Sequence, residues 1–301
     1  MIKINGNFLT TVRTLLAISS LTILVFTPLE GLFPAFHMEK VTEGASWIES
    51  MNIFLWFRNI YIPYWLSIIV LGLVMIGIMP RITSVLHTLV SYSIFYSLLI
   101  VEGGDQINAI LTFLLLPVCL CDNRINGWKN QDIIIENKYL AYFIYINMYI
   151  IMVQMALLYL NAGIAKLFQN EWNNGTAVYY WFNESLFGAP EWMATLFGWL
   201  FTNNFTVALI NYGVILLELF LFIGLFLKRK VKYRLFIFGF VFHFLIWIVH
   251  GLPSFWISMT AGLVLYLLDY KISIKDNLIL CKKAFSSIFK YDNFQRTFES
   301  K

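Results

Sequence analysis

The chain has 301 residues, of which 59% are apolar, 18% aromatic and only 13% charged. A soluble domain of this size cannot bury so much apolar surface, so the composition indicates a membrane protein with several spans. The formal net charge is +4, and attraction to anionic lipids accounts for this balance without a nucleic-acid partner.

Apolar segments long enough to cross, or nearly cross, a hydrocarbon core of about 30 Å recur along the chain. The sequence predicts an all-α transmembrane bundle of about eight helices within residues 1–270, followed by a basic cytoplasmic tail, 271–301, that forms an interfacial helix. The predicted spans are residues 9–27, 60–79, 83–100, 106–121, 139–165, 205–227, 235–250 and 254–270.

Positive charges are unevenly distributed among the predicted loops. Lysines and arginines gather at the N-terminus, in alternate loops and in the tail, and the exceptions are Lys40, Arg58 and Lys166. Because cytoplasmic loops are enriched in lysine and arginine, this pattern predicts that both termini are cytoplasmic. The three cysteines show no ligand spacing, so no metal site is predicted.

Three amides recur in the fifth predicted span. Asn147, Gln154 and Asn161 follow one another at seven-residue steps. Seven residues leave a drift of only about 20° around a helix, so the amides form one stripe. The stripe serves either for hydrogen bonds between helices or as the lining of a polar route.

Lys166 ends the same helix at its predicted outer end. It lies about 36 Å from the inner boundary near Tyr142, at or beyond the edge of the apolar core. One interpretation is a lysine that extends to the lipid headgroups. The other is a covered lysine that acts as a base or nucleophile, with Ala162 and Gly163 allowing the close approach of a helix or a ligand.

Glu218 lies near the middle of the sixth span, with no cation within one helical turn. A lone carboxylate there is costly, so Glu218 should be protonated or paired, and His243 is the predicted partner. His250 follows about 10.5 Å further along the same helix face. The three groups form either a column of titratable residues or hydrogen-bonded parts of the core.

Glu102-Gly-Gly-Asp105 forms a short predicted outer turn, since two glycines allow a tight reversal. Its carboxylates face the same side as Lys166. They either pair with that lysine or form a solvated turn.

Several of these residues stand in an order that resembles the HTTM family, the membrane domain shared with vitamin K-dependent γ-carboxylases. The length and N-terminal pattern look most like the SdpB group of bacterial membrane proteins within it. The pattern comprises Arg13-Thr-Leu-Leu-Ala, Glu102-Gly-Gly-Asp105, Tyr159-x-x-Ala-Gly-x-x-Lys166, Trp172-x-x-Gly175-Thr-Ala177, Glu218 and His243…His250-Gly.

The resemblance implies a base. In γ-carboxylases the lysine of this motif deprotonates vitamin K hydroquinone on the lumenal side, which gives Lys166 that role on the outer face, supported by Glu218, His243 and His250. The chain lacks the large lumenal portions of the carboxylases, so vitamin K is not carried over and the cofactor is unknown. The candidate substrate contacts are Trp172, Gly175, Asn161, Gln154, Glu102 and Asp105.

Members of the SdpB group act with a small cytosolic SdpA-type protein to produce a secreted antimicrobial peptide from its precursor. The resemblance therefore implies a maturation factor for a secreted toxin in the bacterial plasma membrane, and an enzyme if Lys166 is a base. A non-enzymatic peptide exporter or immunity protein is a second hypothesis. A quinone- or lipid-dependent oxidoreductase is a third.

Overall fold

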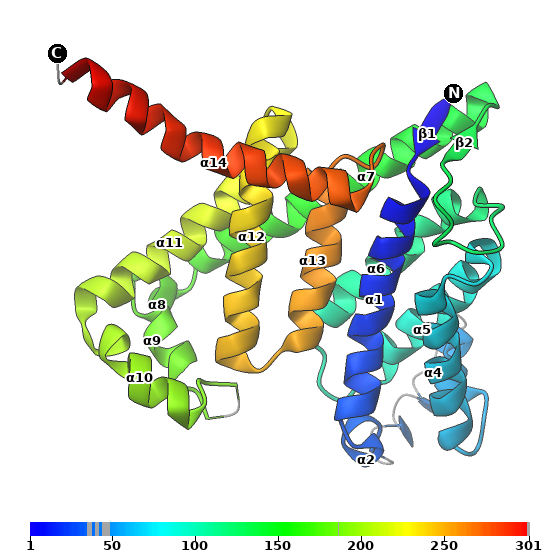
Figure 1. Cartoon of the computed structure of the whole chain (residues 1–301). Coiled ribbons are helices and arrows are strands. Elements are labelled where there is room, and N and C mark those ends of the chain that lie inside the picture. The colour runs from blue at the N-terminus through cyan, green and yellow to red at the C-terminus, as the bar shows by residue number, and fades with distance from the viewer. Residues whose placement is uncertain (35–37, 40–41, 44–48, 186, 300–301) are drawn as a thin grey trace. The chain divides into compact units, whose positions relative to one another are not determined.

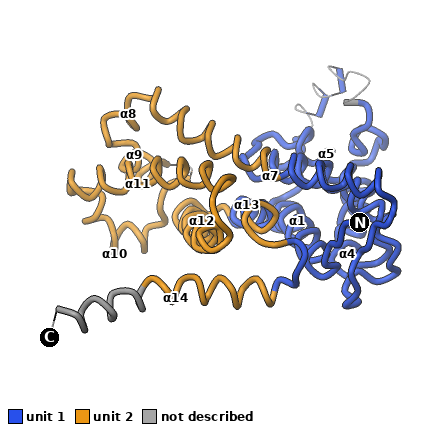
Figure 2. The backbone as a smooth tube through the Cα atoms, turned by 90° about the horizontal axis from the view of Figure 1, so that it is seen from above, with its two compact units in different colours: residues 1–151, 253–262, 270–274 blue, residues 152–252, 263–269, 275–301 orange. Residues whose placement is uncertain are grey.

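Helices make up most of the chain in the computed structural model (Figure 1). The model describes residues 1–34, 38–39, 42–43, 49–185 and 187–299. The backbone forms two compact units, which are described separately (Figure 2). Unit 1 comprises residues 1–151, 253–262 and 270–274, and unit 2 comprises residues 152–252, 263–269 and 275–301.

Unit 1 contains the first four predicted spans as helices that pack on one another. They are α1 (Gly6–Phe26), α4 (Tyr61–Ile76), α5 (Pro80–Ser97) and α6 (Gly103–Leu120). Buried aliphatic side chains such as Leu24, Leu71 and Val90 form the core between α1, α4 and α5. Burial of such side chains inside the unit, rather than against lipid, fixes the positions of these helices.

Local sequence sets where these helices begin and end. The side chain of Asn5 accepts a hydrogen bond from the backbone of Phe8 at 3.0 Å and caps α1. Gly77 ends α4 with a φ of +81°, which glycine adopts without strain, and Pro80 opens α5. The helix boundaries therefore lie close to those of the predicted spans.

Unit 1 also contains short elements outside the predicted spans. β1 (Ile2–Ile4) pairs antiparallel with β2 (Ile133–Ile135), and Ile2 lies opposite Ile135. The other short elements are α2 (Leu29–Leu32) and the 3₁₀ helices Glu49–Met51 and Ile53–Leu55. These elements are a minor addition to a fold that is all-α in class, as predicted.

Unit 2 contains the sixth and seventh predicted spans, parts of the fifth and eighth, and most of the tail. Its elements are the second half of α7 (Lys138–Leu167), α8 (Asn170–Asn173), α9 (Ala177–Phe182), α10 (Glu191–Thr202), α11 (Asn204–Ile223), the 3₁₀ helix Gly224–Phe226, α12 (Arg229–His250), the end of α13 (Pro253–Leu267) and most of α14 (Ile274–Glu299). The tail is thus a helix, and Arg234 on α12 donates to the carbonyl of Ala284 on α14 at 3.0 Å.

Among the described residues, five helices are long and apolar enough to cross a membrane: α1, α6, α7, α11 with its 3₁₀ extension, and α12. The helices α4 and α13 are apolar but shorter. Each of the eight predicted segments coincides with a helix, which confirms that these segments are helical. Eight crossings and cytoplasmic termini stay predictions.

Candidate functional site

In unit 2 the helices α7 and α11 approach closely at Gly163. A β-carbon added at Gly163 would lie 3.0 Å from Cδ2 of Leu219 and 3.6 Å from Cβ of Glu218. The missing side chain is what lets the two helices meet, and a helix rather than a ligand occupies this space. Three residues further on, Nζ of Lys166 lies 2.7 Å from Oε1 and 2.8 Å from Oε2 of Glu218.

This ion pair corrects the predicted partner of Glu218. The sequence placed His243 at a similar depth and paired the two, whereas the structure pairs Glu218 with Lys166. Counting residues along straight helices placed Lys166 at the outer edge of the membrane and Glu218 near its middle. Because the two side chains are in contact, these two predicted depths cannot both be correct. The close approach at Gly163 and the length of a lysine side chain explain the difference.

Trp172 covers the ammonium group. Its ring centroid lies 5.2 Å from Nζ of Lys166, within the range of a cation–π interaction. Asn211 on α11 holds the backbone of Trp172 in place by donating to its carbonyl at 2.8 Å. Gly175 turns the chain with a φ of +76°, so its role here is a backbone one. The Trp-x-x-Gly motif therefore fixes an aromatic ring over the lysine.

Tyr159 is a member of this site to which the sequence analysis gave no role. It is 1% exposed, and among the described residues its hydroxyl has no hydrogen-bond partner. Its ring lies 6.0 Å from that of His243 and 6.5 Å from that of Tyr266, and it is within range of the charge on Glu218. The signal was present, since Tyr159 and Lys166 are seven residues apart on one helix face. A buried hydroxyl without a partner is costly and marks a place for a polar ligand or a water.

The two histidines have different surroundings. Nδ1 of His243 lies 2.6 Å from the carbonyl oxygen of Gly239, so in the neutral ring Nδ1 carries the proton and Nε2 is the acceptor. Nδ1 of His250 lies 2.7 Å from the carbonyl oxygen of Phe187, in the loop before α10. Of the predicted column, His243 adjoins the ion pair through Tyr159, while His250 anchors a loop.

The three amides of the predicted stripe differ in burial along α7. Asn147 is buried, Gln154 is half-buried and Asn161 is exposed. The three amides share a helix but not an environment. A continuous polar lining along this helix therefore has no support from their burial.

Glu102 and Asp105 form a capping box at the start of α6. The backbone of Glu102 donates to Oδ2 of Asp105 at 3.1 Å, and Ser254 donates to Oε1 of Glu102. Burial raises the pKa of Glu102, and the hydrogen bond from Ser254 acts in the opposite direction. Asp105 is buried, so the turn is not a solvated one, and the carboxylate that pairs with Lys166 is Glu218.

The arrangement in unit 2 can exchange a proton. The side chain of Lys166 is 20% exposed and that of Glu218 is 7% exposed, so the amine can be reached while the carboxylate is shielded. Transfer of one proton from Nζ to a carboxylate oxygen gives a neutral amine and a neutral acid, and burial lowers the cost of this neutral pair relative to two charges. Within the described part of the chain, no group of three or more His, Cys, Asp and Glu side chains is placed to hold a metal ion.

The fold and the site define a class: a helical membrane protein with a lysine–carboxylate pair between two long apolar helices. The chain is 35% identical over 284 residues to the sporulation-delaying protein SdpB of Bacillus subtilis (strain 168), covering 93% of this chain and 84% of that protein. It is 34% identical over 266 residues to the uncharacterized protein YitO of the same organism, covering 85% and 83%. The chain therefore belongs to the SdpB family.

No family model matches the chain, so its resemblance to the wider HTTM family stays a prediction. No solved structure matches it either.

Proposed function

We propose that this protein works in the bacterial plasma membrane in the production of a secreted, sporulation-delaying-type peptide toxin. Membership of the family supports this, because the relative at 35% identity is a sporulation-delaying protein. We further propose that Lys166, together with Glu218, acts as the base that removes a proton from the substrate during this maturation. The observation that carries this second part is the ion pair itself, which is buried on the glutamate side and reachable on the lysine side.

The proposed step starts from the ion pair. Nζ of Lys166 passes one proton to Glu218, and the neutral amine then takes a proton from the substrate and becomes an ammonium again. The ring face of Trp172, 5.2 Å from Nζ, stabilises that ammonium. The hydroxyl of Tyr159 is available to donate a hydrogen bond to the anion left on the substrate. This is the γ-carboxylase-like part of the proposal.

The partners proposed are the precursor peptide, a small cytosolic SdpA-like protein and the lipid bilayer. Exposed aromatic side chains on α9 and α10 support contact with a membrane surface, because amphipathic rings are favoured at the headgroup level. They include Tyr180, Trp181, Trp192 and Trp199, each at least half exposed. A peptide at the membrane surface would meet these rings in the same unit that holds Lys166.

The test is the intact mass and killing activity of the peptide secreted by cells that make the precursor with either wild-type protein or Lys166→Ala. The proposal predicts normal membrane accumulation of the variant and at least about a 100-fold loss of active peptide, the range typical of a lost acid–base group. The secreted peptide should then carry the mass of the unmodified precursor.

The matched control is Lys138→Ala, which removes an exposed lysine at the opposite end of the same helix and should leave production unchanged. Full activity in Lys166→Ala would overturn the proton-transfer role. Loss of export without any change in peptide mass would instead favour an exporter.

A further inference from the structure

A second cation lies inside a helix bundle, in unit 1. Arg13 on α1 is 2% exposed and is among the largest fully buried side chains of the described residues. Its Nη2 donates to Oγ1 of Thr83 at 2.8 Å. Its Nε and Nη1 have no hydrogen-bond partner in the described part of the chain, and no carboxylate there lies within ion-pair distance of it. The sequence analysis had counted this arginine among the cations of the N-terminus.

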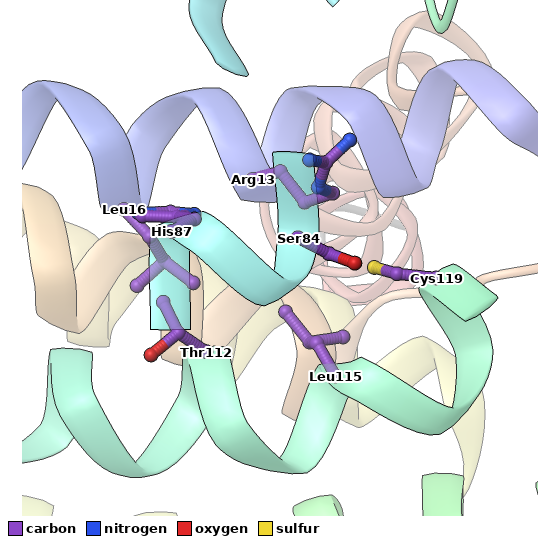
Figure 3. Close-up of a pocket in the computed structure, with 7 residues that line it drawn as sticks. All are labelled: Arg13, Leu16, Ser84, His87, Thr112, Leu115 and Cys119. Atoms are coloured by element: carbon purple, nitrogen blue, oxygen red, sulfur yellow. The ribbon is translucent and has the colours of Figure 1, made fainter. Parts of the chain in front are cut away.

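A small cavity of about 10 Å³ lies beside the guanidinium (Figure 3). α1 contributes Arg13, α5 contributes Ser84 and His87, and α6 contributes Thr112 and Cys119. Figure 3 shows the side chains of Ser84 and Cys119 pointing toward one another below the arginine. None of these side chains is a carboxylate, so the cavity wall supplies no formal negative charge.

Some polar groups on the cavity wall already have a hydrogen-bond partner and others do not. The hydroxyl of Ser84 donates to the carbonyl of Arg81 at 3.0 Å, and that of Thr112 donates to the carbonyl of Asn108 at 2.9 Å. His87 is 2% exposed, and its Nε2 has no partner among the described residues. The groups at the cavity without a partner are therefore the N–H groups of Arg13 and Nε2 of His87. The arginine groups are always donors, and Nε2 is a donor when it carries the proton of the neutral ring.

An unpaired charge in this position is expensive. Removing one partner from a buried ion pair costs several kcal/mol, because an uncompensated charge is left in low dielectric, and cations within membrane helices almost always pair. A water molecule would satisfy N–H groups but would leave the positive charge uncompensated. A cavity of about 10 Å³ has room for one water or a monatomic ion and is too small for an anion the size of gluconate.

We propose that this cavity is an anion site, which takes a monatomic halide, chloride in a cell, as the counterion of Arg13. The free N–H groups of Arg13 and Nε2–H of His87 bind the ion. Because its binding groups come from α1 and α5, the bound ion links these two helices beside α6.

The test uses the full chain, purified in detergent, in buffers of equal ionic strength made with sodium chloride, bromide or gluconate. A ligand that binds only the folded state raises Tm with its concentration. Chloride and bromide should raise Tm saturably above its value in gluconate, which is too large for the cavity. Line broadening of the ³⁵Cl NMR signal should appear on adding the protein and should be reversed by bromide.

Arg13→Gln should abolish both responses. The matched control is Arg81→Gln, which changes an exposed arginine on α5 and should keep both. If Arg13→Gln does not fold, the halide series and the bromide competition on the wild-type chain still show whether the protein binds a halide. Equal Tm values in chloride and gluconate without line broadening would overturn the proposal in favour of a water molecule. A halide response that persists in Arg13→Gln would overturn it in favour of another site.

Discussion

Two ion pairs in this protein differ in how fully their charges are satisfied. In unit 1, Arg124 binds Asp122 through two contacts, at 2.6 and 2.8 Å, and also donates to the carbonyls of Gly127 at 2.6 Å and Gly6 at 3.2 Å. Its side chain is 5% exposed and that of Asp122 is fully buried. Gly6 makes room for the guanidinium, because a β-carbon there would lie 2.1 Å from Nη1 of Arg124.

In unit 2, Nζ of Lys166 contacts the two oxygens of Glu218 and, more weakly, the carbonyl of Ala162 at 3.4 Å. The lysine is partly exposed, and the nearby hydroxyl of Tyr159 has no partner in the described residues. A pair whose charges are saturated by fixed backbone groups holds a turn together. A pair that is reachable and lies in the same site as an unsatisfied hydroxyl has the features that the proposed proton transfer requires.

The largest effect on stability is expected from Asp122→Ala. It leaves the guanidinium of Arg124 buried without its carboxylate, which should lower the free energy of unfolding by about 3–5 kcal/mol. Tm and the amount of protein in the membrane measure this loss. The control is Asp132→Ala, which breaks a partly exposed pair with Lys3 and one hydrogen bond from Asn5 and should cost about 1 kcal/mol. Equal losses in the two variants would contradict the structural role of the Asp122–Arg124 pair.

Tyr159→Phe should separate chemistry from stability in unit 2. The change removes a hydroxyl that has no hydrogen-bond partner among the described residues, so Tm should stay the same or rise. Production of active peptide should fall about tenfold if the hydroxyl acts on the substrate. In the control Tyr266→Phe, a hydroxyl that donates to the carbonyl of Leu221 at 2.7 Å is lost, so stability should fall by about 1 kcal/mol. Wild-type production by Tyr159→Phe would remove Tyr159 from the site.

The smallest effect is expected from Gly175→Ala, which tests how Trp172 is held over the lysine. A φ of +76° disfavours alanine, and the new methyl group would lie 3.3 Å from Tyr212, so Tm should fall by an amount equivalent to about 1 kcal/mol. Gly198→Ala on α10 is the control, since nothing lies near that glycine and alanine favours a helix. A loss of stability of the same size in Gly198→Ala would mean that the turn at Gly175 does not specifically require glycine.

The helices at the eight predicted segments could be predicted from the sequence, because an apolar run marked each one. In the structure, Gly77, Pro80, Gly251 and Pro253 lie at several of their ends. Lys166 stood out by its charge and Glu218 by its depth, but their contact did not. That contact depends on how α7 crosses α11 at Gly163, and a count of residues along separate helices contains no crossing geometry.

The charges of unit 1 were harder to predict for a related reason. Arg124 was counted among cytoplasmic loop cations, yet a turn buries it against Asp122 and the backbone of α1. Arg13 was counted among the cations of the N-terminus, yet it lies in a bundle interior. Charge counts by loop indicate orientation in a membrane, but the burial of a given cation depends on which backbone groups and helices surround it.

The most direct test of the account is Lys166→Arg, with peptide production and membrane accumulation measured side by side. Arginine can keep the positive charge, the ion pair with Glu218 and the contact with the Trp172 ring, but it does not release its proton in a protein. The account predicts normal accumulation and production of active peptide at least about 100-fold below wild type. Wild-type production would contradict it, because the site would then need only the charge of Lys166 and not its proton.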